Sequence, residues 1–501
     1  AELATADQDS HCVHSSPSMT SRPTVVLVPS WGSGHFMSAL EAGKRLLATG
    51  RGAFTLTVLV MHAPSEAMAS EVQGHVRREA ASGLDIRFLQ LPAVEHPTGC
   101  VDPVEFASRY VQLHAPHVKA AIARLGPSSR VAAVVVDLFL TALFDVLHEL
   151  TVPAYVYFAS PAAFLALMLR LPALREDLTG AGFEAMESTV DVPGLPPVPP
   201  SYMPACLVKA KIQSYDWFEY HGRRFMEARG VIVNTSVELE SSILAAIADG
   251  QCVPGRPAPA LHAIGPVVWF GSTDDQQPHE CVRWLDAQPP ASVVFLCFGS
   301  MGSLDAAQVR EVAAGLERSG HRFLWVLRGP PVAGTRLPTD ADLDEVLPEG
   351  FLEATAGRGL VWPAWAPQRE ILSHAAVGGF VTHCGWNSIL ESLWSGVPMI
   401  PWPLYGEQHL NAFELVAGVG AAVALEMDRR KGFFVEAAEL ERAVRSLMGG
   451  ASEEGRKARR TAAETSAACR EAVGEGGSSC AALQRLVREI LVSPTEGNDS
   501  R

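Results

Sequence analysis

The sequence predicts an α/β protein with two doubly wound halves, in each of which helices cover a parallel sheet. Short apolar runs rich in Val, Leu and Phe alternate along the chain with longer segments of helical periodicity. This pattern begins twice in the same way, near residues 23 and 291, with an apolar strand followed by a Gly-Ser loop. A segment rich in Pro and Gly, residues 251–278, separates the two and is the predicted linker.

The apolar runs of the first half are hydrophobic on both faces, as buried parallel strands are. We therefore expect strands at residues 25–28, 56–60, 85–89, 131–137, 154–157 and 231–234. Helices near residues 39–48 and from about residue 65 follow the first two, because parallel neighbours need a crossover connection. The first predicted domain spans residues 23–250.

The second half repeats this arrangement, with a predicted domain at residues 279–470. After the strand near residue 291, we expect strands at residues 323–327, 359–362, 378–382 and 398–401. Residues 452–491 have a helical pattern. Residues 1–22 are polar and lack the apolar core of a signal peptide, so we predict a disordered tail there.

Length and charge limit the classes of function. A chain of 501 residues is too long for one ordinary core, which agrees with two domains. The net charge of −15 argues against a nucleic acid or an anionic membrane surface as partner, since both attract basic proteins. The nine cysteines lack CxxC spacing, which favours a reduced cytoplasmic protein over a disulfide framework. The apolar stretch 155–171 contains Pro161, so we predict no membrane anchor.

The most informative segment is the window 365–408. Within it, residues 377–383 form an apolar run that we expect to be a buried strand. Residues 387–395 have apolar side chains at helical spacing, and Gly396 stands where that helix should end. The window therefore predicts a strand, a tight turn and a helix.

The turn between this strand and this helix is a candidate anion site. The first N–H groups of a helix are unpaired and lie at the positive end of its dipole, so a diphosphate would bind there. His383, at the end of the strand, would add a donor to a phosphate oxygen. A simpler alternative is that Asn387 and Ser388 only cap the helix.

His35 is the candidate general base in the first half. It follows the Gly-Ser loop after the first strand, and histidine titrates near neutral pH. Asp137 ends an apolar strand, where a carboxylate is costly to bury unless it has a partner. The loop before His35 lacks GxGxxG spacing, and no acidic residue ends the second strand, so we discount a nicotinamide site.

The window 365–408 resembles, almost from end to end, the donor-binding signature of plant family-1 UDP-sugar-dependent glycosyltransferases. The resemblance implies the GT-B fold, in which two Rossmann-like domains face each other across a cleft. It also implies that the C-terminal segment 471–501 contains a helix that returns to the first domain.

The same resemblance implies a role for each matching residue. Trp365 would stack on uracil, Ala366 and Gln368 would bind the uracil edge and the ribose, and Glu391 would bind the ribose hydroxyls. Near the diphosphate and the sugar it places Ser300, His383, Gly385, Trp386, Asn387, Ser388, Glu407 and Gln408. His35 would remove a proton from the acceptor with the help of Asp137, and Thr141 would contact the sugar. Many relatives have proline where this chain has Ser38, which we expect to affect the helix start.

The implied activity is an inverting transfer of glucose from UDP-glucose to a hydroxyl of a flavonoid or another phenolic. Gln408 matches the glucose-preferring form of the signature. No DxD sequence stands near the predicted site, so we predict that no metal and no cofactor is required. We expect a monomeric cytoplasmic enzyme whose partners are the UDP-sugar and a small-molecule acceptor.

Several alternatives stay open on the sequence alone. The same donor signature serves C-glucosyltransferases that act on an aromatic ring and O-glucosyltransferases of terpenoids or hormones. A UDP-sugar sensor without activity is a further reading, against which the presence of both His35 and Asp137 argues. A UDP-sugar epimerase or dehydrogenase would need a bound nicotinamide.

Overall fold

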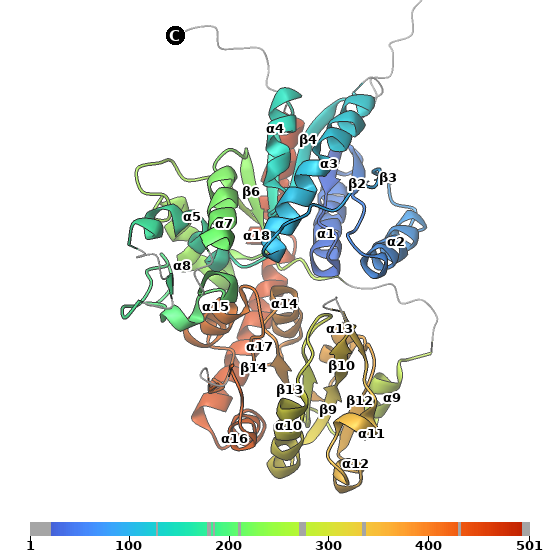
Figure 1. Cartoon of the computed structure of the whole chain (residues 1–501), viewed down its shortest axis with the longest axis vertical. Coiled ribbons are helices and arrows are strands. Elements are labelled where there is room, and N and C mark those ends of the chain that lie inside the picture. The colour runs from blue at the N-terminus through green and yellow to red at the C-terminus, as the bar shows by residue number, and fades with distance from the viewer. Residues whose placement is uncertain are drawn as a thin grey trace, which may run out of the picture.

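The computed structural model describes residues 22–126, 129–177, 182–183, 186–208, 212–269, 277–332, 337–428 and 432–492. These residues form two α/β halves that lie one above the other along the long axis of the molecule (Figure 1). Each half has a parallel sheet flanked by helices, which confirms the predicted fold class. The predicted tail lies outside the described residues except for Arg22, whose guanidinium is 2.6 Å from a carboxylate oxygen of Asp85.

The first sheet has the strand order β3-β2-β1-β4-β5-β6-β7, with every neighbouring pair parallel. Its strands are β1 (Thr24–Val28), β2 (Thr55–Val60), β3 (Ile86–Gln90), β4 (Val131–Asp137), β5 (Ala154–Phe158), β6 (Gly230–Val233) and β7 (Leu261–Ala263). Strand β7 lies inside the segment 251–278 that the sequence predicts as a linker. A strand of three residues between proline-rich flanks is too short to produce a periodic signal, so the sheet continues further than predicted.

Helices connect these strands. They are α1 (Ser33–Gly50), α2 (Glu66–Ala80), α3 (Pro103–Leu125), η1 (Thr141–Leu143), α4 (Phe144–Glu149), α5 (Ala162–Asp177), η3 (Pro200–Tyr202), α6 (Ala205–Val208), α7 (Ile212–Phe225) and α8 (Val237–Ala248). Local chemistry sets where some of them begin. The carboxylate of Asp102 accepts hydrogen bonds from the N–H groups of Val104 and Glu105, and Pro103 occupies the first turn of α3.

The second sheet has the order β12-β9-β8-β13-β14, beside a two-stranded hairpin of β10 and β11. The strands are β8 (Val293–Cys297), β9 (Arg322–Val326), β10 (Arg328–Pro331), β11 (Pro338–Asp340), β12 (Gly359–Trp362), β13 (Val377–Thr382) and β14 (Met399–Pro401). Successive residues of β8 alternate between two hydrophobic clusters, one on each face of the sheet. This double burial explains why these strands are apolar throughout.

The helices of the second half and the C-terminus complete the chain. They are α9 (Glu280–Asp286), α10 (Ala306–Ser319), α11 (Leu343–Val346), α12 (Phe351–Ala354), α13 (Gln368–Leu372), α14 (Trp386–Ser395), α15 (Gln408–Phe413), η4 (Glu414–Val419), α16 (Ala437–Met448), α17 (Glu453–Val473) and α18 (Ser478–Leu491). Helix α18, red in Figure 1, lies beside the first sheet. Its Leu486 is buried in the core of the first half, and its Glu489 accepts a hydrogen bond of 2.9 Å from the hydroxyl of Tyr155.

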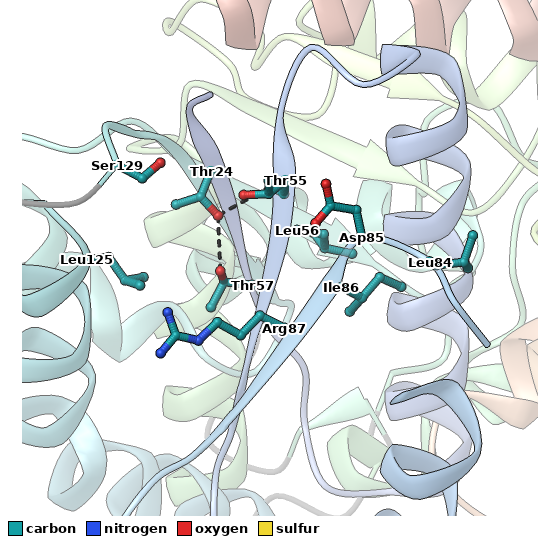
Figure 2. Close-up of a pocket in the computed structure, with 10 residues that line it drawn as sticks. All are labelled: Thr24, Thr55, Leu56, Thr57, Leu84, Asp85, Ile86, Arg87, Leu125 and Ser129. Atoms are coloured by element: carbon teal, nitrogen blue, oxygen red, sulfur yellow. Dashed lines mark hydrogen bonds between the residues drawn. The ribbon is translucent and has the colours of Figure 1, made fainter. Parts of the chain in front are cut away.

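A cavity of about 240 Å³ lies at the amino-terminal edge of the first sheet (Figure 2). Thr24 and Thr57 line it, and their hydroxyl oxygens are 3.0 Å apart. Thr24 begins β1. Asp137, in contrast, is the last residue of β4, and His35 follows the carboxyl end of β1. The cavity is therefore at the end of the sheet opposite to the predicted site residues.

Candidate active site

The structure brings His35 and Asp137 together at the carboxyl edge of the first sheet. Strands β1 and β4 are neighbours although a long stretch of chain separates them, with Val28 opposite Val136. This is the switch point of the strand order, where ligands of such sheets bind. His35 lies in the first turn of α1, and its Nδ1 is 2.8 Å from Oδ2 of the fully buried Asp137.

The surroundings of His35 suit a base. Burial lowers its pKa, but the charge and hydrogen bond of Asp137 and the charge of Glu407 outweigh this, so the pKa lies above the ordinary 6.5. Because an ionised carboxylate accepts the Nδ1–H, the other ring nitrogen is left for a substrate proton. The His35 side chain is 34% exposed, so a ligand can reach it.

The predicted turn and helix of the donor window form β13 and α14. Cys384 in the turn has φ +65°, a left-handed conformation that is uncommon for a residue with a side chain. Gly385 is the N-cap of α14 and provides no side-chain cap, and Gly396 ends the helix with φ +72°. Asn387 and Ser388 therefore do not occupy the N-cap position, which removes the simpler capping alternative.

His383 is buried against two glycines at this turn. A Cβ atom on Gly299 or on Gly385 would lie 2.5 Å from its Nε2, so only glycine leaves room for the ring at either position. Burial lowers the pKa of His383 to about 4, so the ring is neutral at neutral pH. Its Nδ1 has no hydrogen-bond partner among the described residues. Ser300 follows Gly299 and is exposed.

Gln368 and Glu391, two of the residues expected at the uracil and the ribose, are in direct contact. The Gln368 side-chain amide donates to Ser388 Oγ and to Glu391 Oε2, each at 2.8 Å. Burial raises the pKa of Glu391. Trp365 is 63% exposed, which is unusual for so large an apolar ring and leaves its face open. Ala366 beside it is buried.

The two halves meet where the donor sugar is expected. The Asn387 side chain donates to the carbonyl oxygen of Gly34 at 2.8 Å, one residue from His35. The Trp386 indole donates to the carbonyl oxygen of Asn234 at 2.7 Å. Trp386 is thus buried in the contact between the halves, and its predicted place near the sugar stays a prediction.

Glu407 and Gln408 stand at the start of α15. The Gln408 side-chain oxygen accepts hydrogen bonds from the N–H groups of Leu404 and Tyr405, each at 2.9 Å. Glu407 Oε1 accepts a hydrogen bond of 3.0 Å from Ser160 in the first half. The sequence predicts Glu407 and Gln408 as site residues but not Ser160, which carries no recognisable motif.

Comparisons with known proteins show the family of the chain. A family model described as "UDP-glucoronosyl and UDP-glucosyl transferase" matches residues 251–454. A malvidin galactosylase of Oryza sativa subsp. japonica is 62% identical over 94% of this chain and 98% of its own. The chain belongs to the plant UDP-dependent glycosyltransferases.

Further relatives and solved structures of this glycosyltransferase family extend the match. An anthocyanidin 5,3-O-glucosyltransferase of a Rosa hybrid cultivar is 38% identical over 93% of this chain and 98% of its own. The structure of a Polygonum tinctorium UDP-glucosyltransferase that glucosylates indoxyl superposes with a TM-score of 0.83, at 36% identity over 95% and 100% of the two chains. A transferase from Siraitia grosvenorii, solved with UDP, has a TM-score of 0.80, at 38% identity over 94% and 100%.

Thr141 and Ser38 are both buried in this glycosyltransferase, and each hydroxyl has a side-chain partner. Thr141 is fully buried, and its hydroxyl is 2.7 Å from Nδ1 of His221, a core histidine whose pKa burial lowers to about 3. A sugar contact would require Thr141 to leave His221. Ser38 does not lie at the helix start. It is buried and bonds to the hydroxyl of Tyr157 at 2.7 Å, which explains why a polar residue is accommodated in place of proline.

In the described ranges, no three His, Cys, Asp or Glu side chains come together as a metal site would need. None of the helices in the described part of the chain combines the length and the apolar character that a membrane-spanning helix needs. Metal independence, cytoplasmic location and a monomeric state stay predictions.

Proposed function

We propose that this glycosyltransferase transfers a hexose from a UDP-hexose to a phenolic hydroxyl group in one inverting displacement. The observation that carries the proposal is the contact between the Asn387 side chain and Gly34, because it sets the donor turn against His35 and Asp137. The proposed base and the donor turn are therefore neighbours where the two halves meet. This geometry fits direct transfer without a covalent intermediate.

In the proposed step, the free ring nitrogen of His35 accepts the proton of the acceptor hydroxyl. The oxygen attacks the anomeric carbon, the bond from that carbon to the diphosphate oxygen breaks, and UDP leaves with the electron pair. Asp137 stabilises the imidazolium that forms, because it already accepts from Nδ1 at 2.8 Å. Attack opposite the leaving group inverts an α-linked donor to a β-glycoside.

The donor turn stabilises the leaving diphosphate. The N–H groups at the start of α14 and the hydroxyls of Ser300 and Ser388 are its proposed donors. A neutral His383 adds a hydrogen bond without adding charge. Trp365 holds the uracil by stacking, and Glu391 holds the ribose hydroxyls.

We propose a flavonoid, including the anthocyanidins, as acceptor class, because two similar proteins are described as acting on malvidin and on anthocyanidin. For the donor, Gln408 supports the predicted glucose. A second candidate is galactose, since a relative with 62% identity is described as a galactosylase.

The test is a UDP-release assay of the full chain with UDP-glucose and UDP-galactose, each against flavonoids, simple phenols, terpenoid alcohols and hormones. We expect turnover with flavonoids, and β-linked products that acid or a β-glycosidase hydrolyses. The hexose with the larger kcat/KM identifies the donor. A product resistant to acid would indicate a carbon–carbon bond, and no UDP release from any pair would contradict the proposed transfer.

A further inference from the structure

The hydrogen bond between Ser160 and Glu407 joins the acceptor half to the sugar end of the donor site. Ser160 lies between β5 and α5, is 5% exposed, and donates its hydroxyl to Glu407 Oε1 at 3.0 Å. Glu407 is half-buried and immediately precedes α15. The two residues are 247 positions apart, so tertiary structure alone brings them together.

Ser160 stands on a rigid support. Two residues later α5 begins, and the buried carboxylate of Glu240 accepts the N–H groups of Ala162 and Ala163 at 2.9 and 2.8 Å. The carboxyl of Glu414 in η4 is buried beside Glu240, and burial together with the Glu240 charge raises its pKa well above the ordinary range. The two bonds from Glu240 fix the first N–H groups of α5, and with them the short segment that carries Ser160.

The parts of the donor site are held in different ways. Gln368, Ser388 and Glu391 bond to one another within the second half. Gln408 is held there too, by the backbone N–H groups of Leu404 and Tyr405. The side-chain hydrogen bond of Glu407 comes instead from Ser160 in the first half. A glutamate has several rotatable bonds, so fixing one carboxylate oxygen orients the other.

We propose that Ser160 is a positioning residue that orients Glu407 toward the hexose of the donor. The proposal rests on the proposed function, because it takes Glu407 as a contact of the sugar. The acceptor half then contributes to sugar recognition, while UDP is recognised by the second half alone. Loss of the Ser160 hydroxyl weakens binding of the UDP-hexose but not of UDP.

The experiment compares Ser160→Ala with the wild-type chain. Isothermal titration gives the Kd of UDP and of the UDP-hexose without turnover, and initial rates give KM and kcat. We expect the Kd of the UDP-hexose to rise about tenfold, as for a lost hydrogen bond to a charged group. The Kd of UDP should be unchanged. The preference between UDP-glucose and UDP-galactose should also narrow. Ser160→Thr keeps the hydroxyl and should restore both properties.

Two controls separate positioning from a structural effect. Ser478→Ala removes a serine that also donates to a distant glutamate, Glu238, at 2.9 Å, and it should change neither Kd. In a Glu407→Ala background, Ser160→Ala should have no further effect on the UDP-hexose, because it acts only through Glu407.

Equal weakening of UDP and UDP-hexose, or an unchanged Kd for both, would overturn the role of Ser160. So would an additive effect in the Glu407→Ala background. Absence of transfer by the wild-type chain would contradict the proposed function instead, and the titrations would still test Ser160 because they need no turnover.

Discussion

His35 and His383 follow central strands in the two halves of the molecule, yet their surroundings shift their pKa values in opposite directions. His35 contacts a buried carboxylate, and its pKa is raised above 6.5. His383 is packed between two glycines, and burial alone lowers its pKa to about 4. Similar positions in similar folds therefore hold one histidine ready to take up a proton and another that stays neutral.

The difference shows that the charged partner, rather than the fold position, decides the chemistry. A base that must accept a proton benefits from a nearby carboxylate, which stabilises the imidazolium. A ligand of an anionic diphosphate needs only a donor, and a neutral ring gives one without a buried charge to compensate. Each prediction below tests one side of this contrast.

The largest effect should come from replacing the two histidines by alanine. His35→Ala should lower kcat by about 10²–10⁴-fold, the usual contribution of a general base, with little change in the Kd of UDP. His383→Ala should mainly raise the Kd of UDP and should change kcat less. UDP release and calorimetry on both variants check this. Equal losses of kcat in the two would contradict the division of roles.

The pH dependence of catalysis should follow the pKa of His35, which the Asp137 carboxylate raises. The wild-type kcat/KM should rise with pH through the His35 pKa, above 6.5, because only the neutral ring accepts a proton. Asp137→Asn removes the strongest influence that raises this pKa and leaves burial, which lowers it. We expect the acid limb to move to lower pH and the maximal rate to fall by on the order of 10²-fold. An acid limb that stays at the same pH would show that the group titrating in the kcat/KM profile is not His35.

The glycine beside His383 should be necessary for donor binding. Gly299→Ala adds a Cβ 2.5 Å from the His383 ring, at φ +76°, so the ring must shift and UDP should bind about tenfold more weakly. Gly320→Ala is a matched control, since Gly320 has φ +73° with nothing within 4 Å of the added atom. The control carries the same backbone strain, so calorimetry of both variants isolates the clash. Equal UDP affinities in the two variants would show that the ring position does not matter.

The smallest effect concerns stability against acid. His383 has a lower pKa folded than unfolded, so its contribution is present above 6.5 and is lost as the pH falls toward about 4. His383→Asn cannot titrate, so its free energy of unfolding should fall less between pH 7.5 and pH 5, by on the order of 1–2 kcal/mol. Urea denaturation at both pH values measures this, and an identical loss in the wild type would show that His383 does not contribute.

Much of the fold and of the site followed from local patterns. Apolar strands that are buried on both faces, the glycine that ends α14, and the polar turn at Asn387 are each encoded within a few residues, because period, capping and turn chemistry are local. The short strand β7 was missed, since three residues among prolines give no period. The window 365–408 was also recognisable without any knowledge of what faces it.

By itself, then, the sequence determined the two α/β halves, the donor turn and the identity of the candidate base. Only the tertiary structure decided that β1 lies beside β4, that Asn387 reaches Gly34, and that Ser160 holds Glu407. It also decided that Thr141 bonds to His221 and that the two histidines have opposite pKa shifts. The physical reason is that strand order, burial and charge–charge distances depend on residues far apart in the chain, which no local pattern records.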